Sequence, residues 1–320
     1  MLTTRTVAFG YFLAFALVLG AGVAFSQTYP NKSIRIVTAE IGGSGDIATR
    51  TIAQEISGPL GQPVIVDNRG SGFITGEIVA SAAPDGYTLL FASSALWVTP
   101  LLRKTPYDPI KDFAPIALLV TAPNLLVVHP SLPAKSVKEL IDLAKAKPGV
   151  LNYASSLPGT TNHLAAELFK SMAGVNIVGI NYKGGGPGMN DLLGGHVQMM
   201  FVSTGLGTPH LKSGKLRALG VTSLQPSALA PGLPTVASGL PGFEVASVVG
   251  SFAPAKTPAM IINRLNQEIV RALNRSEVKE KYLSIGVETV GSSPAELTAK
   301  MKSEVTRLGK VIRDAGIKAE

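Results

Sequence analysis

The sequence contains no cysteine among its 320 residues, and this absence removes several classes of chemistry at once. Without thiols the chain forms no disulfide bond, binds no metal through thiolates, carries no lipid on a cysteine and has no cysteine nucleophile. Blocks of basic residues with interleaved aromatic side chains are absent too, although the formal net charge is +8. Because nucleic-acid binding needs such a basic patch, we expect no nucleic-acid partner.

Signatures of catalysis and of metal binding are also missing. The sequence has neither a G-x-S-x-G nucleophile turn nor an H-E-x-x-H helix, and its four histidines are scattered. His163 and Glu167 stand four residues apart on a predicted helix, but the sequence indicates no third ligand for a metal. We therefore predict a protein that is not an enzyme and that holds neither a metal nor a cofactor.

What the sequence does contain begins with an apolar segment near its N-terminus. Arg5 precedes the run VAFGYFLAFALVLGAGVAF, which is typical of a secretory signal peptide. Ala24 and Ser26 fit the −3 and −1 positions of a cleavage site, so we predict that residues 1–26 are removed and that the mature chain begins at Gln27. The alternative is a membrane anchor, because the run is nearly as long as a spanning helix. No later run has that length, so the mature chain is expected to be soluble.

Strand-like apolar runs alternate with helix-like runs along almost the whole mature chain. The predicted strands span 33–39, 62–68, 86–93, 115–121, 124–130, 150–156, 176–182, 196–202, 215–222 and 246–252. Most are continuously apolar, which is typical of strands buried on both faces of a mostly parallel sheet. Helix starts carry cap signals at Ser136, at Thr257-Pro258 and at Ser293. The alternation predicts an α/β architecture.

The chain is long enough for two lobes, yet it contains no low-complexity linker. We therefore predict that the chain crosses from one lobe to the other and returns. The first lobe would comprise 27–122 and 248–320, and the second 123–247. The outward crossing is expected near Leu119–Asn124 and the return near Glu244–Phe252. Two crossing segments of this kind form a hinge.

The glycine-rich loop after the first strand admits two interpretations. From Gly43 the sequence matches G-x-G-x-x-A, and Asp67 lies about 20 residues further on, as in a dinucleotide-binding fingerprint. However, Glu40 and Asp46 bracket the glycines and would repel a pyrophosphate. We interpret Asp46 as the N-cap of a helix over 46–57, and the loop as part of a solute site. An NAD-type oxidoreductase is the alternative.

Other predicted strands also end in small polar or glycine residues that start a helix. These loops are Ser93-Ser94, Ser155-Ser156 with Pro158 to Thr161, Lys183 to Pro187, and Ser203 to Gly205. In open α/β sheets ligands bind outside the carboxyl ends of the strands, where helix N-termini offer free N–H groups and a partial positive charge. Together these loops predict a binding site for a small anion, although Ser203 to Gly205 is better interpreted as a capped turn.

Long stretches of the mature chain resemble one known family. They are, in order, SIRIVTAEIGGSGDIATR, LGQPVIVDNRGSG, APDGYTLL, YDPIKDFAPIA, SLPAKSVKELIDLAKAKPG, LNYASSLPGTTNHLAAELFK, YKGGGPGMNDLLGGHVQMMF, GKLRALGVTS and LPTVASGLPGFE. In this order they are similar to the periplasmic solute-binding proteins of the Bug family, the receptors of tripartite tricarboxylate transporters. The similarity covers essentially the whole mature chain.

The resemblance implies a type II periplasmic-binding-protein fold, whose two lobes close on a small organic acid or an amino-acid-like ligand. It also implies a periplasmic location and, as partners, the large and small membrane subunits of the transporter. We expect the protein itself to be a monomer. The family's ligand loops correspond here to Ile41–Asp46, Ser155–His163 and Tyr182–Gly184. A binding protein used for sensing instead of transport is a further alternative.

The candidate ligand-binding residues come from both predicted lobes. They are Glu40, Ile41, Gly42, Gly43, Ser44 and Ser94 in the first lobe, and Ser155, Ser156, Thr160, Thr161, His163, Lys183 and Gly184 in the second. Glu40 predicts a ligand with a donor or ammonium group beside its carboxylate, unless this side chain points outward or pairs with a lysine. Two departures from the family pattern, a shorter approach at Thr38–Ile41 and Gln198 where aspartate is usual, leave a dicarboxylate ligand open.

Overall fold

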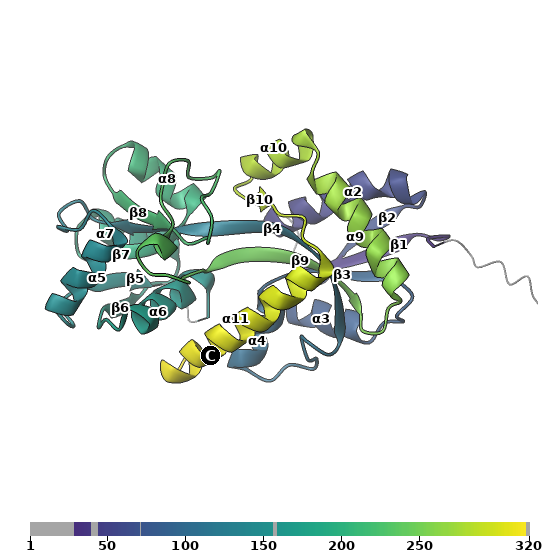
Figure 1. Ribbon diagram of the computed structural model, residues 1–320, viewed down its shortest axis with the longest axis horizontal. Helices are drawn as coiled ribbons and strands as arrows, with labels where there is room; N and C mark the ends of the chain where they lie inside the picture. Colours follow the sequence, from purple (N-terminus) through teal and green to yellow (C-terminus); the bar gives the residue numbers. More distant parts are fainter. Residues whose placement is uncertain (1–28, 40–43, 71, 156–158, 318–320) are drawn as a thin grey trace, which may run out of the picture.

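The computed structural model describes residues 29–39, 44–70, 72–155 and 159–317, and all elements below lie within these ranges. Two groups of helices and strands lie at the two ends of an elongated molecule (Figure 1). Two long strands run between the groups, β4 (Phe113–Val128) and β9 (Ala246–Pro254). Both strands are apolar for most of their length and are largely buried, as expected for the centre of a sheet.

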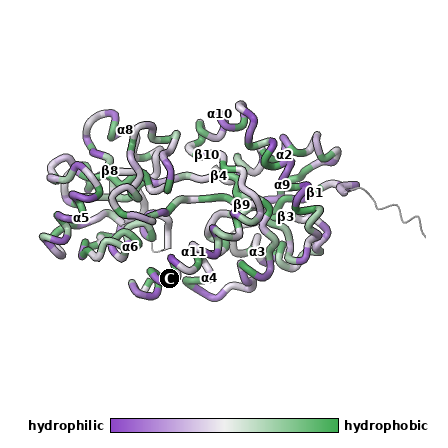
Figure 2. Tube along the Cα trace, viewed as in Figure 1, coloured by the Kyte–Doolittle hydropathy of each residue, from purple (hydrophilic) through white to green (hydrophobic). Residues whose placement is uncertain are grey.

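The first group contains the N-terminal strands and the last helices of the chain. Its strands are β1 (Ile34–Thr38), β2 (Val64–Asn68), β3 (Thr88–Ser93) and β10 (Glu288–Thr289). Its helices are α2 (Ser44–Leu60), α3 (Gly72–Ala80), α4 (Ala95–Leu102), α9 (Ala259–Leu273), α10 (Ser276–Ser284) and α11 (Pro294–Asp314). Strand β1 pairs in parallel with β2 and β3. Figure 2 shows α10 as largely hydrophilic, in keeping with its place at the surface.

The second group contains the middle of the chain. Its strands are β5 (Asn152–Ser155), β6 (Val178–Asn181), β7 (Met199–Ser203) and β8 (Arg217–Val221). Its helices are α5 (Val137–Ala146), α6 (Thr161–Ala173), α7 (Gly185–Leu193), α8 (Thr204–Lys212) and the short 3-10 turn η1 (Val236–Ser238). Strand β5 pairs in parallel with β6 and β7. The predicted α/β architecture is confirmed.

Strand β4 connects the sheets of the two groups. The strand order is β2-β1-β3-β9-β4-β7-β5-β6, with β8 and β10 also paired to β4. From Phe113 to Pro123 β4 pairs antiparallel with β9, and from Asn124 onward it pairs antiparallel with β7 and β8. Proline donates no hydrogen bond to a neighbouring strand, and β4 changes partners at this proline.

The prediction of two separate strands over 115–121 and 124–130 is therefore wrong. The residues form one strand of 16, because the apolar run continues through Pro123 and each side of it finds its own partner. The crossing predicted near Leu119–Asn124 falls within β4, and the return predicted near Glu244–Phe252 overlaps β9. The exact lobe boundaries stay a prediction.

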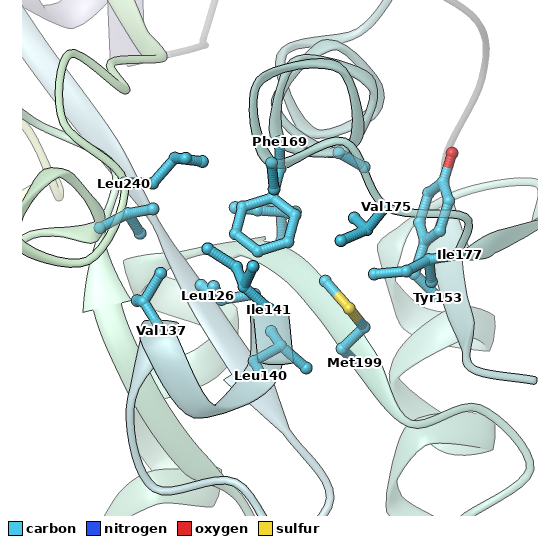
Figure 3. Close-up of a cluster of buried hydrophobic side chains, with 14 of the residues drawn as sticks. Leu126, Val137, Leu140, Ile141, Tyr153, Phe169, Val175, Ile177, Met199 and Leu240 are labelled. Carbon is cyan, nitrogen blue, oxygen red and sulfur yellow. The ribbon is translucent and has the colours of Figure 1, made fainter. Parts of the chain in front are cut away.

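Each group has its own hydrophobic core. In the second group, Phe169 of α6 stands among side chains from α5, β4 and β7 (Figure 3). The rings of Phe169, Phe201 and Phe243 have centroids 5.9 to 6.2 Å apart, a separation typical of favourable aromatic contacts. In the first group, the faces of α2 and α9 pack on β1, β3 and β4. Each core lies mainly within one group, although Val311 of α11 joins the core around Phe169 and Leu164 of α6 joins a core of the first group.

The cap signals were correct at two of the three helix starts. Ser293 and Glu296 form a complete capping box at α11. The Ser136 hydroxyl accepts a hydrogen bond from the Glu139 N–H at α5. Thr257 is not an N-cap, because its hydroxyl donates to the Pro254 carbonyl, 2.7 Å away, and Pro258 takes the cap position of α9.

Helix α11 packs on both groups, against α4 in the first and α6 in the second (Figure 1). Met301 and Ile312 belong to the same buried cluster as Trp97 of α4, whereas Val311 belongs to the cluster around Phe169. In the described part of the chain, no helix combines the length and the apolar character that a membrane span requires.

Candidate functional site

The described residues include only part of the predicted ligand site. Glu40, Ile41, Gly42, Gly43 and Ser156 lie outside them. Helix α2 begins at Ser44, directly after the glycine-rich stretch. The other predicted residues lie where strands β3, β5 and β6 lead into helices α4, α6 and α7. These helix starts therefore follow the carboxyl ends of the three strands, where ligands bind in open α/β sheets.

Asp46 does not take the N-cap position that the sequence predicted, because α2 begins two residues earlier and places Asp46 in the first helical turn. Its carboxylate is buried and accepts a hydrogen bond from Arg50 Nε, 3.2 Å away. It also accepts one from Asn68 Nδ2 at 2.9 Å. A carboxylate in the first turn also interacts favourably with the helix dipole. Asp46 therefore ties the start of α2 to the end of β2.

Asp67, the acidic residue of the dinucleotide fingerprint, is engaged by two arginines. Arg35 Nε donates to one of its oxygens at 2.7 Å. Arg69 Nε lies 3.0 Å from the other oxygen. In a dinucleotide site this carboxylate accepts hydrogen bonds from the ribose hydroxyls. The arginine contacts give Asp67 a structural role here.

Ser94 and Thr161 mark the starts of two helices that belong to different groups. Ser94 precedes α4, its N–H donates to the Val248 carbonyl of β9 at 3.2 Å, and its own carbonyl accepts from the Trp97 N–H. Thr161 is the first residue of α6, whose N-cap is Thr160. The Thr160 hydroxyl accepts from the third N–H of the helix, a common way to satisfy a helix start.

One pocket brings Ser94 and Thr161 together. Its cavity volume is about 20 Å³, room for about one water molecule, and it opens to solvent. Its lining comes from α4 and its N-cap, α6, α11, and the start of β9 with the segment before it: Ser94, Val98, Thr161, Leu164, Glu244, Val245, Ala246, Glu304, Arg307 and Leu308. Two predicted ligand residues from different groups thus share one hollow.

The remaining predicted residues lie outside this pocket. Ser155 is buried at the end of β5. His163 is also buried, with 9% of the residue exposed, and its ring accepts a hydrogen bond from the Gly159 N–H. Lys183 is exposed after β6, and Gly184, with φ of 135°, precedes α7. Only glycine adopts this backbone angle easily, so the turn depends on residue 184.

The charged lining of the pocket was not predicted from the sequence. Glu304 of α11 accepts a hydrogen bond from Trp97 Nε1 at 2.7 Å. Lys300 lies 3.0 Å from Glu304 and 2.9 Å from Glu244. Burial works to lower the pKa of Lys300, but the two carboxylates outweigh it and raise this pKa above its ordinary value. The only sequence signal was the i, i+4 spacing of Lys300 and Glu304.

Arg307 completes the charged lining. Its Nη1 lies 3.4 Å from the Gly242 carbonyl, whereas its Nε is buried without a hydrogen-bond partner among the described residues. Within the same ranges, no three histidine, aspartate or glutamate side chains are placed to hold a metal ion.

The chain is similar to one known protein family, to relatives in sequence and to solved structures. Residues 48–317 match the family described as "Tripartite tricarboxylate transporter family receptor". The chain is 36% identical to protein BugT of Bordetella pertussis over 323 residues, which cover 98% of each chain. It is 36% identical to "R. palustris Rpa4515 with adipate", with a TM-score of 0.67 and coverage of 91% of this chain and 99% of that one.

A TctC solute-binding protein from Polaromonas, solved without ligand, is 25% identical and gives a TM-score of 0.84, with coverage of 90% of this chain and 100% of that one. These matches confirm the predicted periplasmic-binding-protein fold and the resemblance to the Bug family. The family and the fold are those of solute-binding proteins, which are not enzymes. The chain belongs to the tripartite tricarboxylate transporter receptor family.

Proposed function

We propose that this protein is a periplasmic receptor that binds a small organic acid or amphoteric carboxylate between two lobes and delivers it to a membrane transporter. The pocket shared by Ser94 and Thr161 carries this proposal, because it places two helix starts from different groups beside one hollow. The adipate named for the related R. palustris structure supports a carboxylate as the ligand class. Lys183 is the cation of the predicted second-lobe site, and it is exposed to an incoming anion.

The proposed mechanism is closure of the two lobes about β4 and β9. The lobes are 27–122 with 248–320, and 123–247, and each contains a separate core. A ligand that contacts both lobes stabilises the closed arrangement by its difference in affinity for the two arrangements. Strands β4 and β9 pair from Phe113 to Pro123, so the connection is a two-stranded ribbon that bends as a unit.

The conformation of the molecule is proposed to be the open one. Rotation of one lobe against the other lowers a whole-chain TM-score even where each lobe is unchanged. The chain is closer in geometry to the ligand-free Polaromonas protein, at 0.84, than to the adipate-bound R. palustris protein, at 0.67. The order of sequence identity is the reverse, 25% against 36%. An open, ligand-free arrangement of this chain explains why it is geometrically closer to the protein with the lower sequence identity.

The NAD-type oxidoreductase is the weaker candidate. Its fingerprint requires an acidic residue that is free to bind a ribose, and Asp67 is held by Arg35 and Arg69. Asp46 adds a buried negative charge at the helix start that would receive the pyrophosphate. Both observations favour the receptor.

A thermal-shift screen of the purified protein tests the receptor proposal. The panel contains adipate, malate, acidic amino acids, aromatic acids and NAD. A ligand at a hundred times its Kd adds about 2.7 kcal/mol to the free energy of unfolding, which moves the melting temperature by several degrees. We expect a shift with at least one carboxylate. A shift with NAD alone would overturn the proposal.

Two further measurements test location and role. N-terminal sequencing of the exported protein is expected to begin at Gln27, and a retained apolar segment would indicate the membrane anchor instead. Deletion of the gene is expected to abolish uptake of the bound acid. If uptake persists while a response to the acid is lost, the protein serves in sensing. Gel filtration is expected to show a monomer.

A further inference from the structure

The turn that precedes α6 is held by a histidine ring. The Gly159 N–H donates to His163 Nδ1 across 3.3 Å. The backbone N–H of the same histidine donates to the Thr160 hydroxyl across 3.4 Å. Because an amide N–H can only donate, Nδ1 must be the acceptor, and the ring is therefore neutral with its proton on Nε2. The turn and the first helical turn fix each other through these two bonds.

The same turn lies against the other group of the molecule. Gly159 has φ of 82°, and a Cβ placed there would sit 2.7 Å from Cδ1 of Leu102 at the end of α4. Gly159 belongs to the proposed second lobe and Leu102 to the first. Two residues further on, Thr161 lines the pocket together with Ser94 of the first lobe. Gly159 therefore lies at the contact between two predicted ligand-binding segments.

The surroundings of His163 keep its ring neutral. Burial lowers the pKa of His163; Glu167 on the same helix opposes this effect and Lys170 adds to it. The Glu167 charge is already matched, because Tyr153 of β5 donates to it at 2.5 Å and Lys170 lies 2.8 Å from it. Figure 3 shows the Tyr153 hydroxyl pointing away from the apolar cluster.

Other elements near α6 also carry charged groups. From α11 and the segment before β9, the pocket beside Thr161 is lined by Glu304, Arg307 and Glu244. Exposed Arg103 follows Leu102 at the end of α4. The carboxylates of Glu304 and Glu244 are both matched by Lys300.

We propose that His163 is a positioning residue of the ligand site: its neutral ring holds the Gly159 turn against α4, and protonation releases the turn and weakens ligand binding. This proposal rests on the proposed receptor function. A protonated Nδ1 is a donor that faces another donor, so the bond from Gly159 is lost. His163 was predicted to contact the ligand, and its buried, bonded ring assigns it this indirect role instead.

The first test follows the turn itself and needs no ligand. In ¹⁵N-labelled protein, the Gly159 amide signal and the His163 ring signals are recorded from pH 8 to pH 5. We expect the Gly159 amide to move with the titration of the His163 ring, at a pH below about 6.5, the ordinary pKa of histidine. In His163→Asn, whose amide oxygen takes the place of Nδ1 as acceptor, we expect no movement. A Gly159 amide that stays fixed while the His163 ring titrates would overturn the proposal.

The second test measures affinity, with adipate as the probe, at pH 7.5 and pH 5.5. The wild type is expected to bind about fivefold to tenfold more weakly at the lower pH, the equivalent of one hydrogen bond. His163→Asn is expected to bind almost equally at both values, apart from the change in the ionisation of adipate, which is common to all variants. His210→Asn on α8 is the matched control and should follow the wild type.

The outcomes separate the two proposals. If the wild type and His163→Asn have the same pH profile, His163 does not act on the ligand site. If adipate binds at neither pH, adipate is not the ligand. The receptor proposal is then tested with the other compounds of the thermal-shift panel. The Gly159 amide signal still decides in that case whether the ring holds the turn.

Discussion

The starts of α2 and α6 occupy equivalent places in the two groups, since each follows a strand and opens a helix next to a predicted ligand loop. They are fixed in opposite ways. At α2, buried Asp46 is held by the charged Arg50 and by Asn68. At α6, the neutral ring of His163 holds Gly159. The first tie joins a helix to its own sheet, whereas the second positions a turn against the other group. In the proposed clamp, one helix start is therefore anchored by charged groups, and the other by a bond to a neutral ring that we expect to depend on pH.

The largest effect on stability is expected where the contacts of Asp46 with Arg50 and Asn68 are removed. Asp46→Ala leaves Arg50 without its carboxylate and removes one partner of Asn68, so we expect a loss of about 2 kcal/mol in the free energy of unfolding. Urea denaturation at pH 7.5 measures the loss. Asp46→Asn is the control, because it keeps the volume and one acceptor and should lose less. Equal stability of Asp46→Ala and the wild type would show that the contacts of Asp46 do not anchor α2.

A smaller effect on stability is expected at Gly159, which donates to the neutral His163 ring. Gly159→Ala places a side chain at φ of 82° and pushes on Leu102, so we expect a loss of about 1–2 kcal/mol together with weaker ligand binding. Gly232→Ala is the matched control, because Gly232 has φ of 79° and open space where the Cβ would lie. Binding should fall only in Gly159→Ala. Loss of binding in both variants would contradict the special role of the turn.

The cap of α6 should contribute less again. Thr160→Ala removes the hydroxyl that accepts the His163 N–H, so we expect a loss of about 1 kcal/mol, the usual cost of an N-cap. Thr160→Ser keeps the hydroxyl and should recover most of that loss. Denaturation of both variants beside the wild type measures it, and an unchanged Thr160→Ala would mean that the cap does not stabilise α6.

The smallest expected effect is the pH dependence of stability. Burial lowers the pKa of His163 in the folded protein, so the unfolded chain binds a proton more readily there. The corresponding stabilisation is complete above about pH 6.5, the ordinary pKa of histidine, and is lost as the pH falls toward the lowered pKa. The difference in unfolding free energy between wild type and His163→Asn, measured by urea denaturation across this range, should therefore shrink on acidification. A constant difference would contradict this sign.

The strands were predictable from sequence because their apolar runs are long and continuous. Strand β10 was missed, since its two residues, Glu288 and Thr289, are polar and pair only because the chain passes the edge of β4. The merging of two predicted strands into β4 was missed as well. A proline inside an apolar run usually ends a strand, and here the change of partner at Pro123 accommodates it.

The candidate site was only partly predictable. Ser94 and Thr161 were accessible from local patterns, since each belongs to a polar stretch between a strand and a helix. Glu304 and Arg307 of α11 and Glu244 before β9 were not, because only the packing of α11 brings these segments, distant in sequence, together. The role of His163 was also hidden, since the fold and not the sequence decides whether a ring near a helix start is buried.

Helix α11 has a mechanical consequence for the proposed closure. Strands β4 and β9 lie side by side and give the two groups one common axis about which to turn. Contact of α11 with α6 adds a third point of support away from that axis, so twisting about the length of the molecule is resisted while bending is permitted. This support is apolar toward α6, through Leu164, Leu308 and Val311. It is polar toward the segment before β9, through the Lys300–Glu244 ion pair and the hydrogen bond from Arg307 to the Gly242 carbonyl. In the proposed closure, the last helix therefore keeps contacts with both lobes, and we expect these contacts to limit the direction in which the lobes move.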